Sequence, residues 1–124
     1  MKAVELGRGK KVVVDGKEFI IPLPNAYPYL LLDMAHLVVV LYMFVDNRDG
    51  APTSTANVFA FSRDGRILWQ VEPFSPPGLF SYGYLYMKLN EKDQLWLRTW
   101  DNEWALIDQK SGSVLERILP TDSR

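Results

Sequence analysis

Cysteine is absent from this chain of 124 residues. Without thiols the protein can form neither a disulfide nor a zinc site built on cysteine. Histidine occurs once, as His36, beside an apolar segment, where a lone histidine is more often structural than catalytic. We therefore expect no bound metal and favour a structural role for His36 over a catalytic one.

An excess of one charge is also lacking. The sequence has 14 Lys and Arg against 15 Asp and Glu, which leaves a net charge of −1. A nucleic-acid-binding domain of this size usually carries a basic excess, and the longest basic run here is Lys10–Lys11. The charge balance predicts that nucleic acid is not a partner.

Long hydrophobic runs are missing too. The longest apolar run covers 37–45, well short of the roughly 20 residues that a membrane-spanning helix needs. Residues 1–8 lack the apolar stretch of a signal peptide. We expect no membrane partner and a cytoplasmic location.

Sequence motifs of common enzymes and cofactor sites are not found. The chain has no Gly-x-Ser-x-Gly elbow, no Gly-x-Gly-x-x-Gly and no Gly-Lys-Ser phosphate loop. The acidic loop 46–50 fails the spacing of an EF-hand, because position 12 counted from Asp46 is Asn57 rather than Glu. We expect no catalytic residues and no cofactor, and we lean against an enzyme.

The residues that are present favour strands throughout, and no stretch has a sustained helical period with caps at both ends. Residues 10–22 predict an N-terminal hairpin, because Asp15-Gly16 separates two apolar runs. A loop containing Pro28 is expected over 25–29. Further strands are expected over 29–34, 36–44, 57–62, 67–72, 82–87, 94–100, 103–108 and 114–119.

Two of these strand pairs repeat one pattern. Residues 57–69 and 103–116 each consist of a strand, a polar turn ending in Gly, one further residue and an apolar strand. The turn glycines, Gly65 and Gly112, lie 47 residues apart, which is within the size of a propeller blade.

The residues within the two copies extend the likeness. Ala105, Asp108, Ser111 and Gly112 match a blade-type pattern in the second copy, and Ala60, Gly65 and Trp69 match it in the first, where the turn is shorter. This pattern resembles the blade repeat of quinoprotein-like and WD-like β-propellers over 36–72 and 82–119. The resemblance implies local architecture only, since a closed propeller needs at least about four blades.

The predicted fold is therefore all-β and antiparallel. We expect a single domain, 1–124, in which two blade-like meander sheets pack as a compact sandwich or barrel and the N-terminal hairpin is added to them. Self-association into a homodimer is an open alternative to the monomer.

The aromatic residues after the proline-rich break 73–78 are candidates for an interaction surface. Alternation would place Tyr82, Tyr84 and Tyr86 on one face of a strand and Leu85 and Met87 on the other. Tyrosine is enriched in interfaces. The candidate surface consists of Phe74, Phe80, Tyr82, Tyr84 and Tyr86, and the alternative is a tyrosine ladder covered by the N-terminal hairpin.

A second candidate is a ligand platform formed by Trp96, Trp100 and Trp104, next to Asp101 and Glu103. The alternative is that these tryptophans pack in the sheet. Three functions follow, in order of preference: a protein-interaction module of the adaptor, inhibitor or immunity type that binds a protein partner or itself, a small-molecule or carbohydrate-binding domain, and a carboxylate-based hydrolase with His36 as base.

Overall fold

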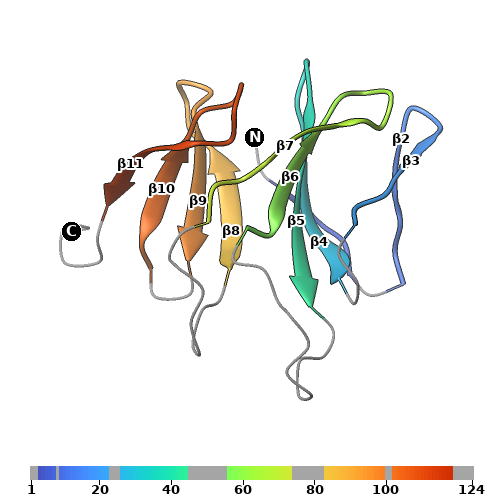
Figure 1. The fold of residues 1–124 in the computed structure, drawn as a ribbon, viewed down its shortest axis with the longest axis horizontal. Helices are drawn as coiled ribbons and strands as arrows, with labels where there is room; N and C mark the ends of the chain where they lie inside the picture. The colour runs from blue at the N-terminus through green and yellow to red at the C-terminus, as the bar shows by residue number, and fades with distance from the viewer. Residues whose placement is uncertain are drawn as a thin grey trace.

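Eleven strands in three antiparallel sheets form the fold that the computed structural model describes, over residues 3–7, 9–22, 26–44, 56–73, 83–99 and 102–118. No helix occurs in these ranges, so the all-β prediction is confirmed. None of the three sheets closes on itself, and they lie side by side as layers (Figure 1), which corresponds to the sandwich rather than the barrel.

The first sheet has the order β1-β4-β5-β6-β7, and the second has the order β11-β10-β9-β8. Apart from β1, each sheet is a four-stranded meander whose strands follow one another along the chain. The strands of the first sheet are β1 (Val4–Glu5), β4 (Ala26–Asp33), β5 (Val38–Phe44), β6 (Val58–Phe61) and β7 (Ile67–Gln70). Those of the second are β8 (Tyr84–Leu89), β9 (Leu95–Thr99), β10 (Trp104–Ile107) and β11 (Val114–Ile118).

The third layer is the N-terminal hairpin of β2 (Val12–Val14) and β3 (Lys17–Phe19). Asp15 and Gly16 both have positive φ, 53° and 79°, as a two-residue hairpin turn with right-handed strand twist requires. The Asp-Gly signal in the sequence therefore predicted this hairpin correctly.

Strand β5 lies in the middle of the molecule and is buried on both faces. Val39 and Leu41 belong to the core between the two large sheets. Val38 and Val40 belong to a second core under the hairpin. This explains why the sequence of β5 is continuously apolar rather than alternating.

One buried polar side chain joins the two large sheets. Asn57, 2% exposed, donates through Nδ2 to the carbonyl oxygens of Tyr42 and Tyr84, both at 2.8 Å. Its Oδ1 accepts from the Tyr84 amide at 2.8 Å. The amide of Asn57 thus serves as a hydrogen-bonded link between β5 and β8.

A second link lies at the turn between β10 and β11. The indole Nε1 of Trp69 donates to the carbonyl of Gln109 at 2.8 Å. Gly112 has a φ of +78°, and a Cβ atom there would lie 2.6 Å from the Trp69 ring. Glycine is needed at position 112 because the Trp69 ring of the first sheet lies directly against the backbone of the second sheet there.

The prediction of a loop over 25–29 is wrong, because β4 already begins at Ala26. The register between β4 and β5 shifts between Pro28 and Leu30. Proline is compatible with a strand at such an irregularity, so Pro28 does not end the strand.

Within the residues that the structure describes, no helix is long and apolar enough to cross a membrane.

Candidate functional site

The tyrosines of β8 do not form the common face that alternation predicted. Tyr84 is fully buried and packs in the inter-sheet core with Met87, whereas Tyr86 is half-buried on the opposite face. The register against β9 shifts between Tyr84, which pairs with Thr99, and Tyr86, which pairs with Arg98. This irregularity reverses the side of the sheet on which the two tyrosines lie, so the prediction that Tyr84 belongs to an exposed surface is wrong.

Several other candidates lie outside the described residues: Phe74, Phe80, Tyr82 and Trp100. Of the predicted aromatic sets, the structure therefore places Tyr84, Tyr86, Trp96 and Trp104.

The structure brings Tyr86, Trp96 and Trp104 to the same side of the second sheet, facing away from the first. In β9, Leu95 and Leu97 point into the core. Because side chains alternate along a strand, Trp96 and Arg98 point outward. In β10, Trp104 and Leu106 lie outward in the same way. We call the outward set Tyr86, Lys88, Trp96, Arg98, Trp104 and Leu106 the cation–aromatic face.

Two cations lie against the rings of this face. The Lys88 Nζ atom is 4.5 Å from the centroid of the Trp104 ring. The Arg98 guanidinium carbon is 5.3 Å from the Tyr86 centroid and 5.9 Å from the Trp104 centroid. The Tyr86 and Trp104 rings meet edge to face, with centroids 6.3 Å apart. Cation–π contacts of this kind hold the charged groups in place but do not neutralise them.

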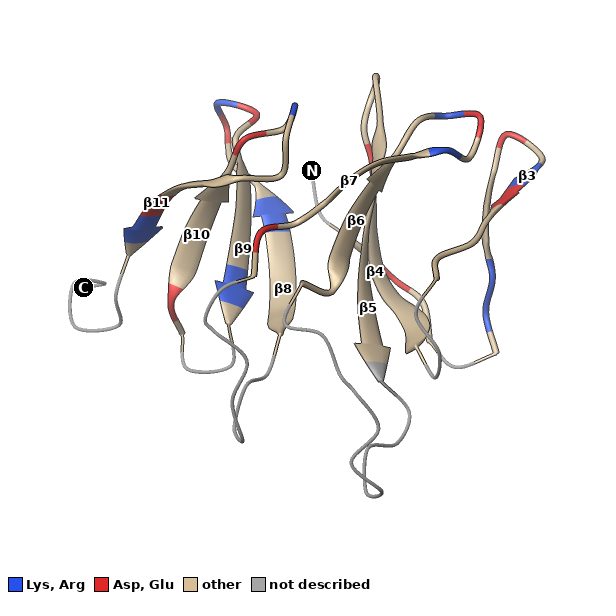
Figure 2. Cartoon of the chain, in the orientation of Figure 1, with Lys and Arg blue, Asp and Glu red and all other residues tan. Residues whose placement is uncertain are grey.

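Neither cation has a carboxylate partner among the described residues, and the buried Nε atom of Arg98 has no hydrogen-bond acceptor there. Figure 2 shows basic bands on β8 and β9 and no acidic residue in either strand. Arg63, by contrast, contacts both Asp15 and Asp33. Glu116 of β11 lies opposite Leu106 on the same side of the sheet. The face therefore carries two cations against one carboxylate around its aromatic rings, in a chain whose net charge is −1.

A family described as a domain of unknown function, DUF7957, matches residues 3–119. The chain belongs to this family. No curated protein and no solved structure matches it.

His36 lines a cleft of about 580 Å³ in the DUF7957 chain, between the turns that follow β4, β8 and β10. Met34, Leu37 and Leu89 provide its apolar lining, and Asp93 lies at it as well. His36 is exposed and has no hydrogen bond or ion pair with any described residue. A general base is usually oriented by a partner, so the cleft does not support the hydrolase hypothesis. The described residues also contain no cluster of His, Asp and Glu that could hold a metal.

Sequence reasoning missed Lys88 and Arg98. The signal for Arg98 was present, because Trp96 and Arg98 are two residues apart in a strand and therefore share a face. Lys88 is likewise two residues from Tyr86 and shares its face. The sequence alone does not show that this face points outward, because the irregularity in β8 decides on which side of the sheet Tyr86 lies.

Proposed function

We propose that this protein is a protein-interaction module that binds a partner through the cation–aromatic face. The observation that carries the proposal is the presence of two tryptophans, a tyrosine and an arginine on one outward sheet face. Tryptophan, tyrosine and arginine are the residues most enriched among interface hot spots.

The exposure of the sheets supports this choice of surface. The first sheet has the second sheet against one side and the hairpin against the other. The second sheet has the first sheet against one side, and none of the described strands covers the other (Figure 1). A half-buried aromatic face of this kind gains free energy when a partner excludes water from it.

The charges indicate the chemistry of the partner. Lys88 and Arg98 are held over rings without a described carboxylate, so a partner with Asp or Glu side chains would complete their ion pairs. A second copy of the chain would bring the two cations of one face toward the same two of the other, which is unfavourable. We therefore favour an acidic protein partner over the homodimer.

A carbohydrate platform is the second candidate, because Trp96 and Trp104 lie on the same face. Small-molecule sites are usually concave. Neither the cleft beside His36 nor the pocket at the hairpin is lined by these tryptophans. Because neither of these two clefts contains a tryptophan, we favour a protein surface over a sugar.

Peptide selection on the immobilised full chain tests the proposal. We expect the selected peptides to contain Asp or Glu beside an aromatic or aliphatic residue. We expect Arg98→Ala and Trp104→Ala to weaken their binding at least about tenfold. Leu115→Ala is the matched control, since Leu115 is 61% exposed on β11 and is not part of the face.

Selected peptides that bind all three variants equally well would place the interaction elsewhere and overturn the proposal. Binding of oligosaccharides on a glycan array that is lost in Trp96→Ala and Trp104→Ala would favour the second candidate instead. Light scattering on a sizing column tests the homodimer. We expect a monomer, and a stable dimer that Trp104→Ala dissociates would place self-association on this face instead.

We also propose that the two meanders are blade-type repeats and that the protein is cytoplasmic. The repeat is supported by the consecutive antiparallel order of β4–β7 and of β8–β11. The location rests on the sequence alone.

A further inference from the structure

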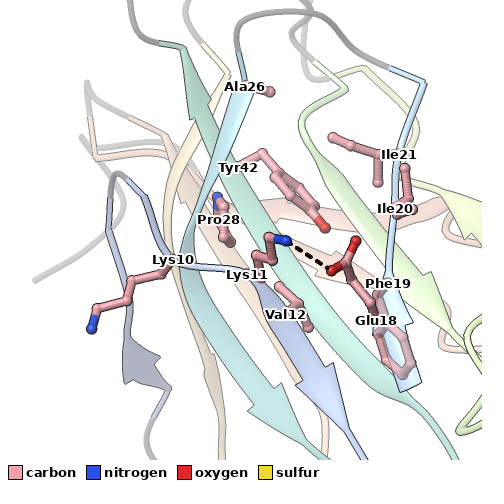
Figure 3. A pocket seen from close by; sticks show the side chains of 10 residues that line it. All are labelled: Lys10, Lys11, Val12, Glu18, Phe19, Ile20, Ile21, Ala26, Pro28 and Tyr42. Atoms are coloured by element: carbon pink, nitrogen blue, oxygen red, sulfur yellow. Dashed lines mark ion pairs between the residues drawn. The ribbon is translucent and has the colours of Figure 1, made fainter. Parts of the chain in front are cut away.

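A pocket of about 190 Å³ lies between the N-terminal hairpin and the first sheet, on the far side of the molecule from the cation–aromatic face. Figure 3 shows the side chains that line it. Those used below are Lys10, Lys11, Val12, Glu18, Phe19 and Tyr42. We call it the hairpin pocket.

The pocket lies where the hairpin packs on the first sheet without pairing with it. Strands β2 and β3 form a two-stranded sheet of their own. At the tip of the hairpin, Arg63 Nε donates to Asp15 at 3.0 Å. At the other end, Phe19 pairs with Val12 and its ring stacks on that of Phe61 with centroids 4.9 Å apart. Lys10 and Lys11 lead into β2 at this same end and line the pocket.

Tyr42 contributes a buried polar atom to the pocket. The residue is 3% exposed, and its hydroxyl is buried without a hydrogen-bond partner among the residues described. Burial raises the pKa of Tyr42 well above its ordinary value, so the hydroxyl stays protonated and can donate. A buried hydroxyl without a partner is costly and calls for an explanation.

The charged residues lie at the same end as this hydroxyl. Figure 3 shows the Tyr42 hydroxyl pointing toward the side where Lys11 and Glu18 lie. Their ion pair of 3.4 Å joins side chains that are 74% and 43% exposed, so it contributes little and can rearrange. With Lys10 and Lys11 against Glu18, the lining has a net positive charge.

We infer that the hairpin pocket binds a small carboxylate with an apolar body. The carboxylate would accept a hydrogen bond from the Tyr42 hydroxyl beside the Lys11 ammonium, and the body would contact Val12 and Phe19. A cavity of roughly 150 Å³ holds benzene, so the volume of about 190 Å³ fits a single ring or a short aliphatic chain together with its carboxylate.

Benzoate is the probe, in a titration of the ¹⁵N-labelled full chain followed by amide chemical shifts. We expect shifts at the hairpin pocket and tighter binding of benzoate than of benzyl alcohol or benzylammonium. In Tyr42→Phe the dissociation constant should rise at least about fivefold, because the hydrogen-bond donor is gone. Lys11→Ala should weaken the binding of benzoate but leave the binding of benzyl alcohol unchanged.

Tyr29→Phe is the matched control, since it deletes a hydroxyl from a half-buried tyrosine that packs against the other core. We expect it to bind benzoate as the unchanged chain does. Tyr42→Phe should fold as stably as the original or more so, because it removes an unpartnered polar atom. The Lys11 side chain is exposed. We therefore expect Lys11→Ala to fold, so that it tests the inference even if Tyr42→Phe does not fold.

Three results would overturn the inference: no amide shifts at millimolar benzoate, equal benzoate binding by Tyr42→Phe and the unchanged chain, or a structure from benzoate-soaked crystals with only water at the Tyr42 hydroxyl. A preference for benzylammonium would also contradict it, since the positive lining would then play no part.

Discussion

Asn57 illustrates how a single polar residue can decide the arrangement of two sheets. Its side chain makes hydrogen bonds to the backbone of two strands that belong to different sheets. A Cβ atom on Gly83 would lie 2.1 Å from the Asn57 Oδ1 atom. Position 83 therefore has no room for a residue larger than glycine while Asn57 keeps its place. The link is buried, and its hydrogen bonds are therefore not exposed to competition from water.

Asn57→Ala should destabilise the protein by about 3 kcal/mol, because it removes three buried hydrogen bonds at roughly 1 kcal/mol each. Urea unfolding measures the change. Asn90→Ala is the matched control, since Asn90 also makes three hydrogen bonds but in the turn between β8 and β9. We expect a loss there of about 1 kcal/mol or less. Equal losses of stability in both variants would mean that the hydrogen bonds of Asn57 between the sheets stabilise the protein no more than those of Asn90 in its turn.

The sequence identified some of the candidate site residues but could not orient all of them. Trp96 and Trp104 were singled out and do lie on one face. Tyr84 and Tyr86 were assigned a common face and lie on opposite ones, because the irregularity in β8 depends on the pairing with β9. Such an irregularity is not encoded in the period-2 pattern itself. Asn57 was read as the start of a strand, since nothing local indicates that it is buried.

At the scale of elements, the N-terminal hairpin depends on Arg63 for its position. The Arg63 guanidinium contacts Asp15 at 3.0 Å, Asp33 at 2.6 Å and the Met34 carbonyl at 2.9 Å. The hydrogen bonds to Asp33 and Asp15 raise the pKa of Arg63 further above its ordinary value, so it remains charged at any pH at which the protein folds.

Arg63→Gln should loosen the hairpin without unfolding the sheets. Hydrogen exchange is expected to accelerate at the amides of β2 and β3 while the amides of β5 keep their protection. Arg66→Gln is the control, because Arg66 pairs only locally with Asp64 in the same turn. If both variants exchange alike, the contact of Arg63 with Asp15 does not hold the hairpin.

The elements themselves were largely predictable. Runs rich in Val, Ile and aromatic residues, separated by Asp-Gly and similar turns, located the hairpin and β5 to β11 to within a few residues. Strand β4 extends over the predicted loop because pairing with β5 compensates for Pro28. Strand β1 has two exposed residues and no pattern of its own, so only its pairing with Leu30 and Leu31 reveals it.

At the scale of the whole molecule, the order of the layers follows from β5. Its two buried faces require a layer on each side, and the second sheet and the hairpin provide them. The sequence predicted two sheets and a hairpin because the strands of each meander are consecutive. It could not predict which face remained uncovered, since that depends on contacts between residues far apart in the chain.

The two buried tyrosines make the whole fold sensitive to alkaline pH. Burial raises the pKa of Tyr84 to about 12 and that of Tyr42 above its ordinary value as well. In the unfolded chain both titrate near pH 10. Between about pH 10 and about pH 12 the unfolded state therefore loses protons that the folded state keeps, and unfolding becomes more favourable.

With respect to these groups, stability should thus stay constant below about pH 10 and fall as the pH rises above it, by roughly 2 kcal/mol at about pH 12 from Tyr84 alone. Urea unfolding at a series of pH values measures the slope, and phenolate absorbance should show these two tyrosines ionising only as the protein unfolds. Tyr84→Phe should make the slope smaller, leaving only the contribution of Tyr42. A stability that stays flat through this range would mean that the two hydroxyls reach water in the folded protein, which would also remove the unpartnered donor from the hairpin pocket.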